Sequence, residues 1–403
     1  MNSTRAIAGD GIGAGLASGP VPRATATTHP PLQSWLPSDK VVLTSYGRTG
    51  VYLALMTIGV RRREVMIPAF TCATALPPAI LQSGGIPVFV DINEQTMDMD
   101  LGCLERKNST SARVVISHHY YGSTASNVRG IQEFSRRNGL IHIEDCTHSL
   151  GAGCEGDGVG QIGDVAVYSF SKLLNCPGGG AVTFKDPALL ERAREVQREY
   201  ANPFHSFVTN TEACKYELEL RDDRPGSTRI DAGVERSAWS GFARRLVVKT
   251  LCDGRFYRRG AFRAMAAGEV GMFRPGLDTR MTGLQESRIT RMMGCMSAVV
   301  RERRRKARLL DRVMPSYFKD FEANVWMQYV TRHPKVEALA LNLQAHGIRT
   351  RRVWPYTQKY WADQLTQSVR ALRDELLLID VDSVSDAALD VLCRGGGRMV
   401  SGI

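Results

Sequence analysis

The chain has 403 residues, of which 43% are hydrophobic, and a formal net charge of +11. This length exceeds the usual size of one domain, so we expect a large domain and a smaller one with ample residues to bury a core. No apolar run approaches the roughly 20 residues that cross a bilayer, and residues 1–39 lack the apolar segment of a signal peptide, so we expect no membrane span and a cytoplasmic location.

The nine cysteines are odd in number and lack paired spacings, which argues against a disulfide framework and against a metal site. Much of the basic excess lies in residues 244–263 and 301–308. Such clusters are usually solvated helix faces, and the functional alternative is a positive field that attracts an anionic substrate such as a sugar diphosphate. No recognition motif for nucleic acid accompanies the charge, so we expect no nucleic-acid partner.

In chain order, residues 1–39 are rich in Gly, Ala, Thr and Pro, which predicts a flexible N-terminal arm. Residues 40–200 alternate short β-rich runs with loops and helical segments, which predicts a large α/β domain with a mostly parallel central sheet. Ligands bind at the carboxyl ends of the strands in such sheets. The runs expected to form strands are 65–67, 87–90, 114–117, 140–143, 165–170 and 181–184.

Residues 201–280 are polar and basic with few strand signals, and we interpret them as an insertion or lid region. From Met281 onward, apolar residues recur at near-helical spacing and predict one long helix before the charges of residues 301–306. Apolar runs at 353–354 and 376–379 complete the prediction of a smaller C-terminal α/β domain over residues 281–403.

Two residues at predicted strand ends point to a cofactor. Lys172 follows the run 165–170, and Asp145 closes the run that begins at Leu140. A lysine can form a Schiff base with the aldehyde of pyridoxal 5'-phosphate, and an aspartate can keep its pyridine nitrogen protonated. Desolvation of Lys172 in a pocket would favour its neutral, nucleophilic amine. Taken alone, Lys172 fits a surface loop and Asp145 fits a helix N-cap, so the prediction rests on the pair.

Further residues match the other groups of this cofactor. Gly47–Arg48–Thr49 precedes a predicted helix, whose N-terminus would attract the phosphate, and Ser169 adds a hydroxyl. His148 is placed to hydrogen-bond the phenolic oxygen, although a single histidine is more often structural. The glycines at 178–180 fit either a close approach to the cofactor or a sharp turn.

An ordered set of stretches resembles the DegT/StrS-type family of fold type I pyridoxal phosphate enzymes, most of which are sugar aminotransferases. The resemblance runs from about residue 45 to 184 and returns at 278–292. The stretches of this chain that carry the resemblance are Gly47–Thr49, Leu53–Leu55, Pro68–Thr71, Pro87–Asp91, His119–Gly122, Glu144–His148, Ser169–Lys172, Gly179–Val182 and Arg280–Gln285.

The resemblance implies a fold type I transferase in which Lys172 and Asp145 are catalytic. Both also bind the cofactor, and they are joined in this role by residues that the family places at the phosphate and the phenolic oxygen: Gly47, Arg48, Thr49, His148 and Ser169. It further implies a homodimer with the site at the subunit boundary.

Four features differ from the family pattern. Ser169 is closer to Lys172 than usual, Cys72 stands near the position of an aromatic residue stacked on the cofactor, and Asp278 stands where an asparagine often reaches the partner's cofactor phosphate. The span from Lys172 to Arg280 is also long for the family.

We therefore expect an aminotransferase that moves an amino group from an amino acid, glutamate or glutamine, to a keto-sugar that is nucleotide-linked. One alternative is another pyridoxal phosphate reaction, a dehydration or condensation on a non-sugar substrate in specialised metabolism. The other is a non-catalytic family member that binds a ligand or partner.

Overall fold

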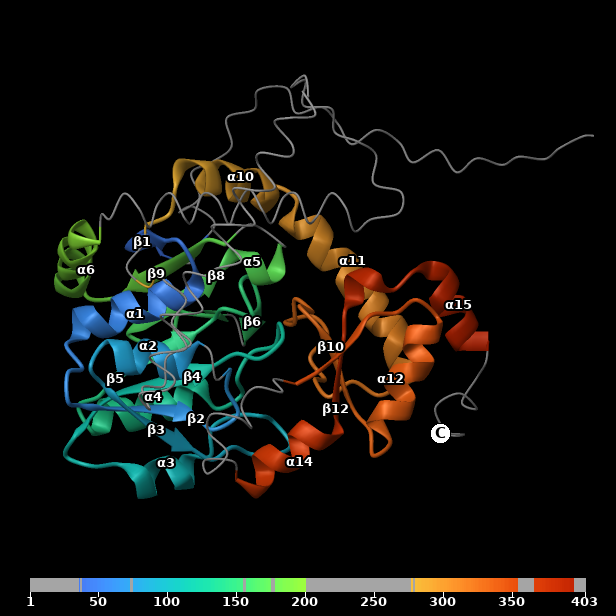
Figure 1. Ribbon diagram of the computed structural model, residues 1–403, viewed down its shortest axis with the longest axis horizontal. Coiled ribbons are helices and arrows are strands. Elements are labelled where there is room, and N and C mark those ends of the chain that lie inside the picture. The colour runs from blue at the N-terminus through green and yellow to red at the C-terminus, as the bar shows by residue number, and fades with distance from the viewer. Residues whose placement is uncertain are drawn as a thin grey trace, which may run out of the picture.

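The computed structural model describes residues 36, 38–72, 75–154, 157–174, 178–200, 277, 280–353 and 366–394. The predicted arm at 1–39 and the predicted insertion at 201–280 lie almost entirely outside these residues. Figure 1 shows a large sheet in the blue and green part of the chain and a smaller sheet in the orange and red part.

The large sheet has seven strands in the order β1-β9-β8-β5-β4-β2-β3. The pairs among β5, β8, β4, β2 and β3 are parallel, whereas β9 pairs antiparallel with β8 and with β1. The prediction of a mostly parallel central sheet is therefore confirmed. Its strands are β1 (Val41–Thr44), β2 (Glu64–Pro68), β3 (Ile86–Val90), β4 (Ala112–His118), β5 (Ile141–Asp145), β8 (Val165–Ser169) and β9 (Gly180–Phe184).

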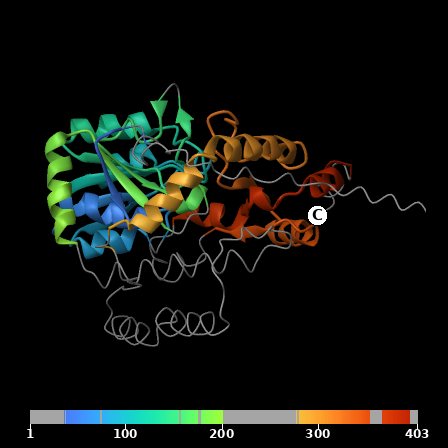
Figure 2. The same cartoon turned by 90° about the horizontal axis from the view of Figure 1, so that it is seen from above.

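Helices cover both faces of this sheet. Successive strand residues point to opposite faces, and the strands carry apolar residues on both, so each face needs a layer of helices. Val65 and Ile67 pack in the same apolar cluster as residues of α1 and α2, whereas Met66 between them packs with residues of α3 and α4. Figure 2 shows the blue helices on one side of the sheet and the teal helices on the other. The helices of this part are α1 (Gly47–Ile58), α2 (Leu76–Gln82), α3 (Leu101–Lys107), α4 (Val128–Arg137), α5 (Phe170–Leu173) and α6 (Pro187–Glu199).

The small sheet is antiparallel, in the order β10-β12-β11. Residues of α11, α12 and α15 share an apolar cluster with its strands. Its elements are β10 (Tyr329–Arg332), α12 (Val336–Ala345), β11 (Thr350–Arg352), α14 (Gln367–Glu375), β12 (Leu376–Ile379), the 3₁₀ turn Val381–Ser383 and α15 (Asp386–Arg394). A two-stranded ribbon, β6 (Gly153–Cys154) with β7 (Asp157–Gly158), lies apart from both sheets.

The single long helix predicted from Met281 is wrong in one respect. Two helices, α10 (Gly283–Met293) and α11 (Met296–Asp311), replace it, and they are separated at Gly294 and Cys295. The backbone N–H of Cys295 donates to the carbonyl of Met292, which closes a tight turn there. Glycine has a low helix propensity, which favours the break at Gly294. The helical spacing of apolar residues nevertheless continues across this break, so the spacing alone predicts one helix. None of the helices described here is long and apolar enough to span a membrane.

Candidate active site

Three neighbouring parallel strands end at one edge of the large sheet. His118 is the last residue of β4, Asp145 of β5 and Ser169 of β8, and the register pairs His118 with Asp145. Because the carboxyl ends of parallel strands meet at one edge, these three residues lie at the same edge of the sheet, where the sequence predicts Asp145 and Lys172.

Asp145 is a buried carboxylate held by two donors. The distance from Nδ1 of His118 to its Oδ2 atom is 2.8 Å, and the backbone N–H of Thr147 donates to Oδ1 over 3.1 Å. Burial alone would raise the pKa of Asp145, but His118, Thr147 and His148 together hold it well below its usual range. Turns rather than a helix follow this residue, so Asp145 does not cap a helix.

His148 is also buried. Its Nδ1 atom lies 3.4 Å from Nε2 of His118, and its ring stacks on that of Tyr121 with centroids 5.5 Å apart and planes inclined by 25°. Burial, and then the charges of His118 and Lys172, lower the pKa of His148 well below its usual value. The imidazole of His148 is therefore neutral at physiological pH, and the charge of Lys172 contributes to this electrostatically.

Lys172 lies in the short helix α5, directly after β8, which places it at the predicted edge. Its side chain is exposed. The expected desolvation of this amine is therefore not seen in the single chain.

The start of α1 meets the same edge. A Cβ atom on Gly47 would lie 2.9 Å from Cγ2 of Thr147 and 3.0 Å from Cβ of Ser169, so only a glycine fits without a shift. The structure thereby brings Gly47 and Ser169 together beside the turn that follows Asp145. An N-terminus of a 12-residue helix at this place favours an anion.

The other two residues predicted for the phosphate have contacts of their own. The hydroxyl of the fully buried Thr49 lies 3.1 Å from that of Ser45. The guanidinium carbon of Arg48 lies 5.0 Å from the ring centroid of Tyr46, a distance typical of a cation–π contact.

The glycine run after Lys172 packs against the residues that begin α1 and is hydrogen-bonded to them. The N–H of Gly179 donates to the carbonyl of Ser45 over 2.5 Å, and Nε2 of Gln285 donates to the same carbonyl over 3.3 Å. A Cβ atom on Gly180 would lie 2.5 Å from the backbone of Tyr46. Turn geometry and close backbone approach, which the sequence left open for 178–180, therefore occur together, and the close approach is to α1.

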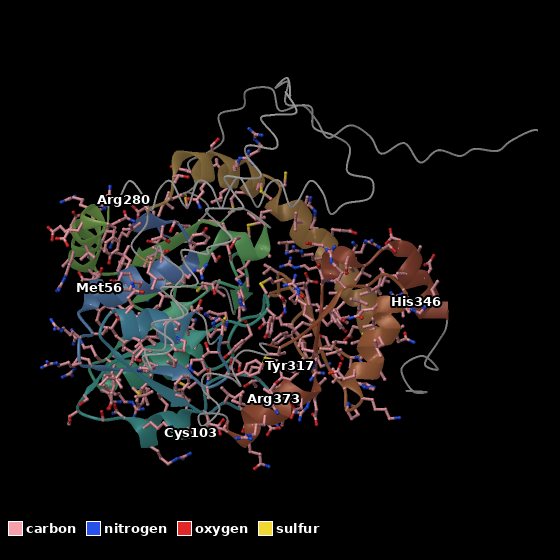
Figure 3. All side chains as sticks on the ribbon, in the orientation of Figure 1. Met56, Cys103, Arg280, Tyr317, His346 and Arg373 are labelled. Atoms are coloured by element: carbon pink, nitrogen blue, oxygen red, sulfur yellow. The ribbon has the colours of Figure 1, made fainter. Side chains whose placement is uncertain are left out.

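Helix α10 supports this junction. Thr282 and Gln285 form a capping box at its start, and Gln285 is fully buried. Arg280, at the left of Figure 3, donates from Nε and Nη2 to the carbonyl of Gln197 at the end of α6 over 2.9 and 2.7 Å. The segment that closes the sequence resemblance thus anchors the backbone beside the site.

Two departures from the family pattern have different outcomes. Cys72 is half-buried and contributes, after burial, to raising the pKa of Tyr121, so it lies near the ring that stacks on His148. Asp278 lies outside the described residues, as does most of the span between Lys172 and Arg280.

Glu144 precedes Asp145 and points to the other face of the sheet. Its carboxylate accepts hydrogen bonds from His119 over 3.0 Å and from the backbone N–H groups of Gly160, Ile162 and Gly163. Burial would raise the pKa of Glu144, but these donors lower it to about 2. Although His119, Glu144 and Cys146 lie close together, four donors already occupy the carboxylate, and we assign the cluster a structural role.

The sequence prediction missed His118. The expected strand 114–117 stopped one residue before it, and the motif at 119–122 began one residue after it. The available signal was the parallel pairing of two strands, because the strand that ends at Asp145 needs a neighbour whose last residue lies beside that carboxylate.

Comparisons with known proteins find a family model and solved structures that are similar to this chain. Residues 31–219 match the family model described as the DegT/DnrJ/EryC1/StrS aminotransferase family. The UDP-N-acetyl-3-dehydro-alpha-D-glucosamine 3-aminotransferase of Acidithiobacillus ferrooxidans is 33% identical over 183 residues, which are 43% of this chain and 49% of that protein. The chain therefore spans about half the length of the curated relatives it matches.

Solved structures agree over most of the chain. The aminotransferase TlmJ from Streptoalloteichus hindustanus has a TM-score of 0.65 and 19% identity, with 92% of this chain and 88% of that chain covered. NtdA from Bacillus subtilis, solved with bound cofactor PMP, has a TM-score of 0.61 and 17% identity, with 90% and 73% covered. These likenesses confirm the fold type I prediction, and the family match confirms the sequence resemblance. Residues 31–219 of this chain match the DegT/DnrJ/EryC1/StrS aminotransferase family model, and the described residues share the fold of solved aminotransferases.

Proposed function

We propose that this chain is a pyridoxal phosphate-dependent aminotransferase that moves an amino group from an amino acid to a nucleotide-linked keto-sugar. The observation that carries the proposal is the joint position of Asp145, the last residue of β5, and Lys172, which follows the carboxyl end of the adjacent strand β8. The family of residues 31–219 supports the reaction, and the name of the Acidithiobacillus relative supports a sugar substrate.

The residues at this edge suit the chemical groups of pyridoxal phosphate. The buried carboxylate of Asp145 suits a protonated pyridine nitrogen, and the exposed amine of Lys172 suits an aldehyde. The start of α1 suits a phosphate, because Gly47 packs directly against Ser169 and against Thr147, next to the Asp145 turn. His148 suits the phenolic oxygen.

When bound, pyridoxal phosphate supplies an electron sink for the electron pair left on a substrate carbon after a proton is removed. Asp145 contributes a full negative charge at a buried position, because His118 and Thr147 keep its carboxylate ionised. Lys172 would hold the aldehyde carbon until the amino group of the substrate displaces it, and its freed amine would then accept the proton from the substrate carbon at Nζ and return it.

The identity of the substrate, the glutamate or glutamine donor, the homodimer and the cytoplasmic location are parts of the same proposal. The net charge of +11 supports an anionic substrate, since a positive field concentrates diphosphates near the protein. The division into a large domain at 40–200 and a small one at 281–403 is likewise a proposal.

The first experiment measures the absorbance of purified protein with pyridoxal phosphate, before and after borohydride reduction. We expect a visible band, and after reduction a stable adduct that peptide mass mapping assigns to Lys172. Lys172→Ala should lose both the adduct and all amination. Lys185→Ala is the matched control, because that lysine directly follows β9 of the same sheet and its amine donates to the carbonyl of Ile162, away from the proposed site.

Assays with a panel of keto-sugars then separate the alternatives. Amination of one or more nucleotide-linked members supports the proposed substrate class. Bound cofactor without amination of any member would favour a dehydration or condensation on a non-sugar substrate. No cofactor absorbance at any concentration of pyridoxal phosphate would favour a non-catalytic binding protein, and a fully active Lys172→Ala variant would refute the reaction.

A further inference from the structure

A second buried imidazole, that of His118, lies between Asp145 and His148, the two residues assigned to the cofactor ring. His118 is at most 6% exposed, as are Asp145 and His148. Its Nδ1 atom is 2.8 Å from Oδ2 of Asp145, and its Nε2 atom is 3.4 Å from Nδ1 of His148. The rings of the two histidines meet edge to face, with centroids 4.9 Å apart.

The charge of Asp145 fixes the direction of this chain of contacts. An ionised carboxylate only accepts hydrogen bonds, so Nδ1 of His118 carries a proton in every state. When His118 is neutral, its Nε2 atom accepts, and Nδ1 of His148 must donate. When His118 is an imidazolium, its Nε2 atom donates, and Nδ1 of His148 must accept.

The consequence appears at the far nitrogen of His148. A neutral imidazole carries one proton, so a donor at Nδ1 leaves Nε2 as an acceptor, and an acceptor at Nδ1 makes Nε2 a donor. The protonation state of His118 therefore sets whether Nε2 of His148 offers or receives a hydrogen bond.

We propose that His118 is a positioning residue that joins Asp145 to His148 and sets the donor or acceptor role of His148 toward the ligand of the site. This inference rests on the proposed function, because it assigns the ends of one hydrogen-bonded chain to two different edges of the same cofactor ring. One end keeps Asp145 ionised, and the other presents either an acceptor or a donor to the phenolic oxygen.

Few other groups compete for the proton. Burial raises the pKa values of Tyr120 and Tyr121 well above the usual range, so both phenols stay neutral. The titratable groups that face the two histidines are Asp145 from β5, Tyr120 and Tyr121 from the segment after β4, and Lys172 from α5.

Three variants of His118 separate its two contacts. His118→Asn keeps an amide donor near the position of Nδ1, and thus the contact to Asp145. His118→Gln keeps an amide near the position of Nε2, and thus the contact to His148. His118→Phe removes both contacts and keeps a ring. His142→Asn is the control, because His142 is buried on β5 but contacts Ser117, Gln132 and Asp164 instead.

The first readout is the dissociation constant of pyridoxal phosphate from the apoprotein, measured by equilibrium dialysis. We expect His118→Phe to raise it at least about tenfold, since a hydrogen bond to a charged group is lost. We expect His118→Asn and the His142 control to stay within about threefold of wild type. The midpoint of the pH titration of the visible band should shift in His118→Asn and His118→Phe.

The second readout needs no cofactor. Nitrogen-15 NMR of histidine-labelled apoprotein should show the proton of His148 moving from Nδ1 to Nε2 as the pH falls. In His118→Phe and His118→Asn this exchange should be lost, and in the His142 control it should remain.

The outcomes distinguish the inference from the proposed function. Wild-type protein that binds no pyridoxal phosphate refutes the proposed function, while the NMR of the apoprotein still decides the role of His118. A His148 proton that stays on one nitrogen in wild type at every pH overturns the inference. So does a His118→Phe protein with the wild-type dissociation constant, midpoint and NMR signals.

Discussion

Neighbouring residues at the end of β5 serve opposite faces of the sheet. Asp145 faces the proposed site, whereas Glu144 faces the loop at 160–163, because side chains alternate along a strand. Both carboxylates are buried, and in both the donors around them outweigh the cost of burial. One ionised carboxylate supports the proposed chemistry, and the other supports the fold.

The contribution of Glu144 to stability should depend on pH. Its pKa is about 2 in the folded chain against 4.5 ordinarily, so the folded state favours the ionised form. The resulting stabilisation, about 3 kcal/mol, is fully present above pH 4.5 and is lost as the pH falls toward 2. We therefore expect Glu144→Gln to be less stable than wild type by about 2–3 kcal/mol at pH 7, with a difference that shrinks below pH 4.5.

Urea unfolding at a series of pH values measures this difference. Glu105→Gln is the control, because Glu105 is an exposed partner of Arg137, and such surface pairs contribute little. A difference between Glu144→Gln and wild type that stays constant from pH 7 to pH 3 would show that the carboxylate charge is not what stabilises the loop.

At the scale of elements, the site depends on how closely α1 approaches the sheet edge. Gly47 packs against Thr147 and Ser169, and the carbonyl of Ser45 accepts hydrogen bonds from Gly179 and Gln285. Strand ends, the α1 start and the α10 cap therefore form one junction. A substitution at Gly47, the first residue of α1, should therefore weaken the binding of an anion at the start of this helix.

We expect Gly47→Ala to move the start of α1 outward, because its Cβ atom would lie 2.9 Å from Thr147. Overpacking of this kind costs about 1–3 kcal/mol of stability. The dissociation constant of pyridoxal phosphate should rise about tenfold, which dialysis measures. Gly283→Ala is the control, since nothing lies within 4 Å of its added methyl group at the start of α10. Equal affinities for both variants would separate α1 from the phosphate.

At the scale of the whole molecule, the two sheets share one apolar core. Val330, Val369 and Leu378 of the C-terminal part belong to the same cluster as the strands and helices of the large sheet. Tyr317, labelled between the two parts in Figure 3, donates its hydroxyl to the carbonyl of Glu94. Arg332 also reaches Glu94, over 3.3 Å.

This shared core predicts one cooperative unfolding transition rather than two. Calorimetry should give a single peak, and tryptophan fluorescence and circular dichroism should report the same midpoint. Tyr317→Phe removes one hydrogen bond, so it should reduce the free energy of unfolding by about 1 kcal/mol and lower the midpoint without splitting the transition. Two separated transitions would instead indicate that the parts at 40–200 and 281–403 fold independently.

Local patterns predicted much of the fold. The β-rich runs at 65–67 and 114–117 predicted strands that the structure extends by one or two residues at each end, whereas α1 begins at Gly47, within the segment that the sequence placed before the helix. The break at Gly294 was missed because apolar spacing reports the buried face of a helix and not the continuity of its backbone.

The sequence by itself determined the resemblance to a family, the mostly parallel sheet and the place of Asp145 and Lys172 at strand ends, because short β-rich runs and ordered motifs are local properties of the chain. Only the tertiary structure decided the partner of Asp145, the contact of Gly47 with Ser169 and the exposure of Lys172. These depend on strand register and on packing between segments tens of residues apart, and no local spacing encodes them.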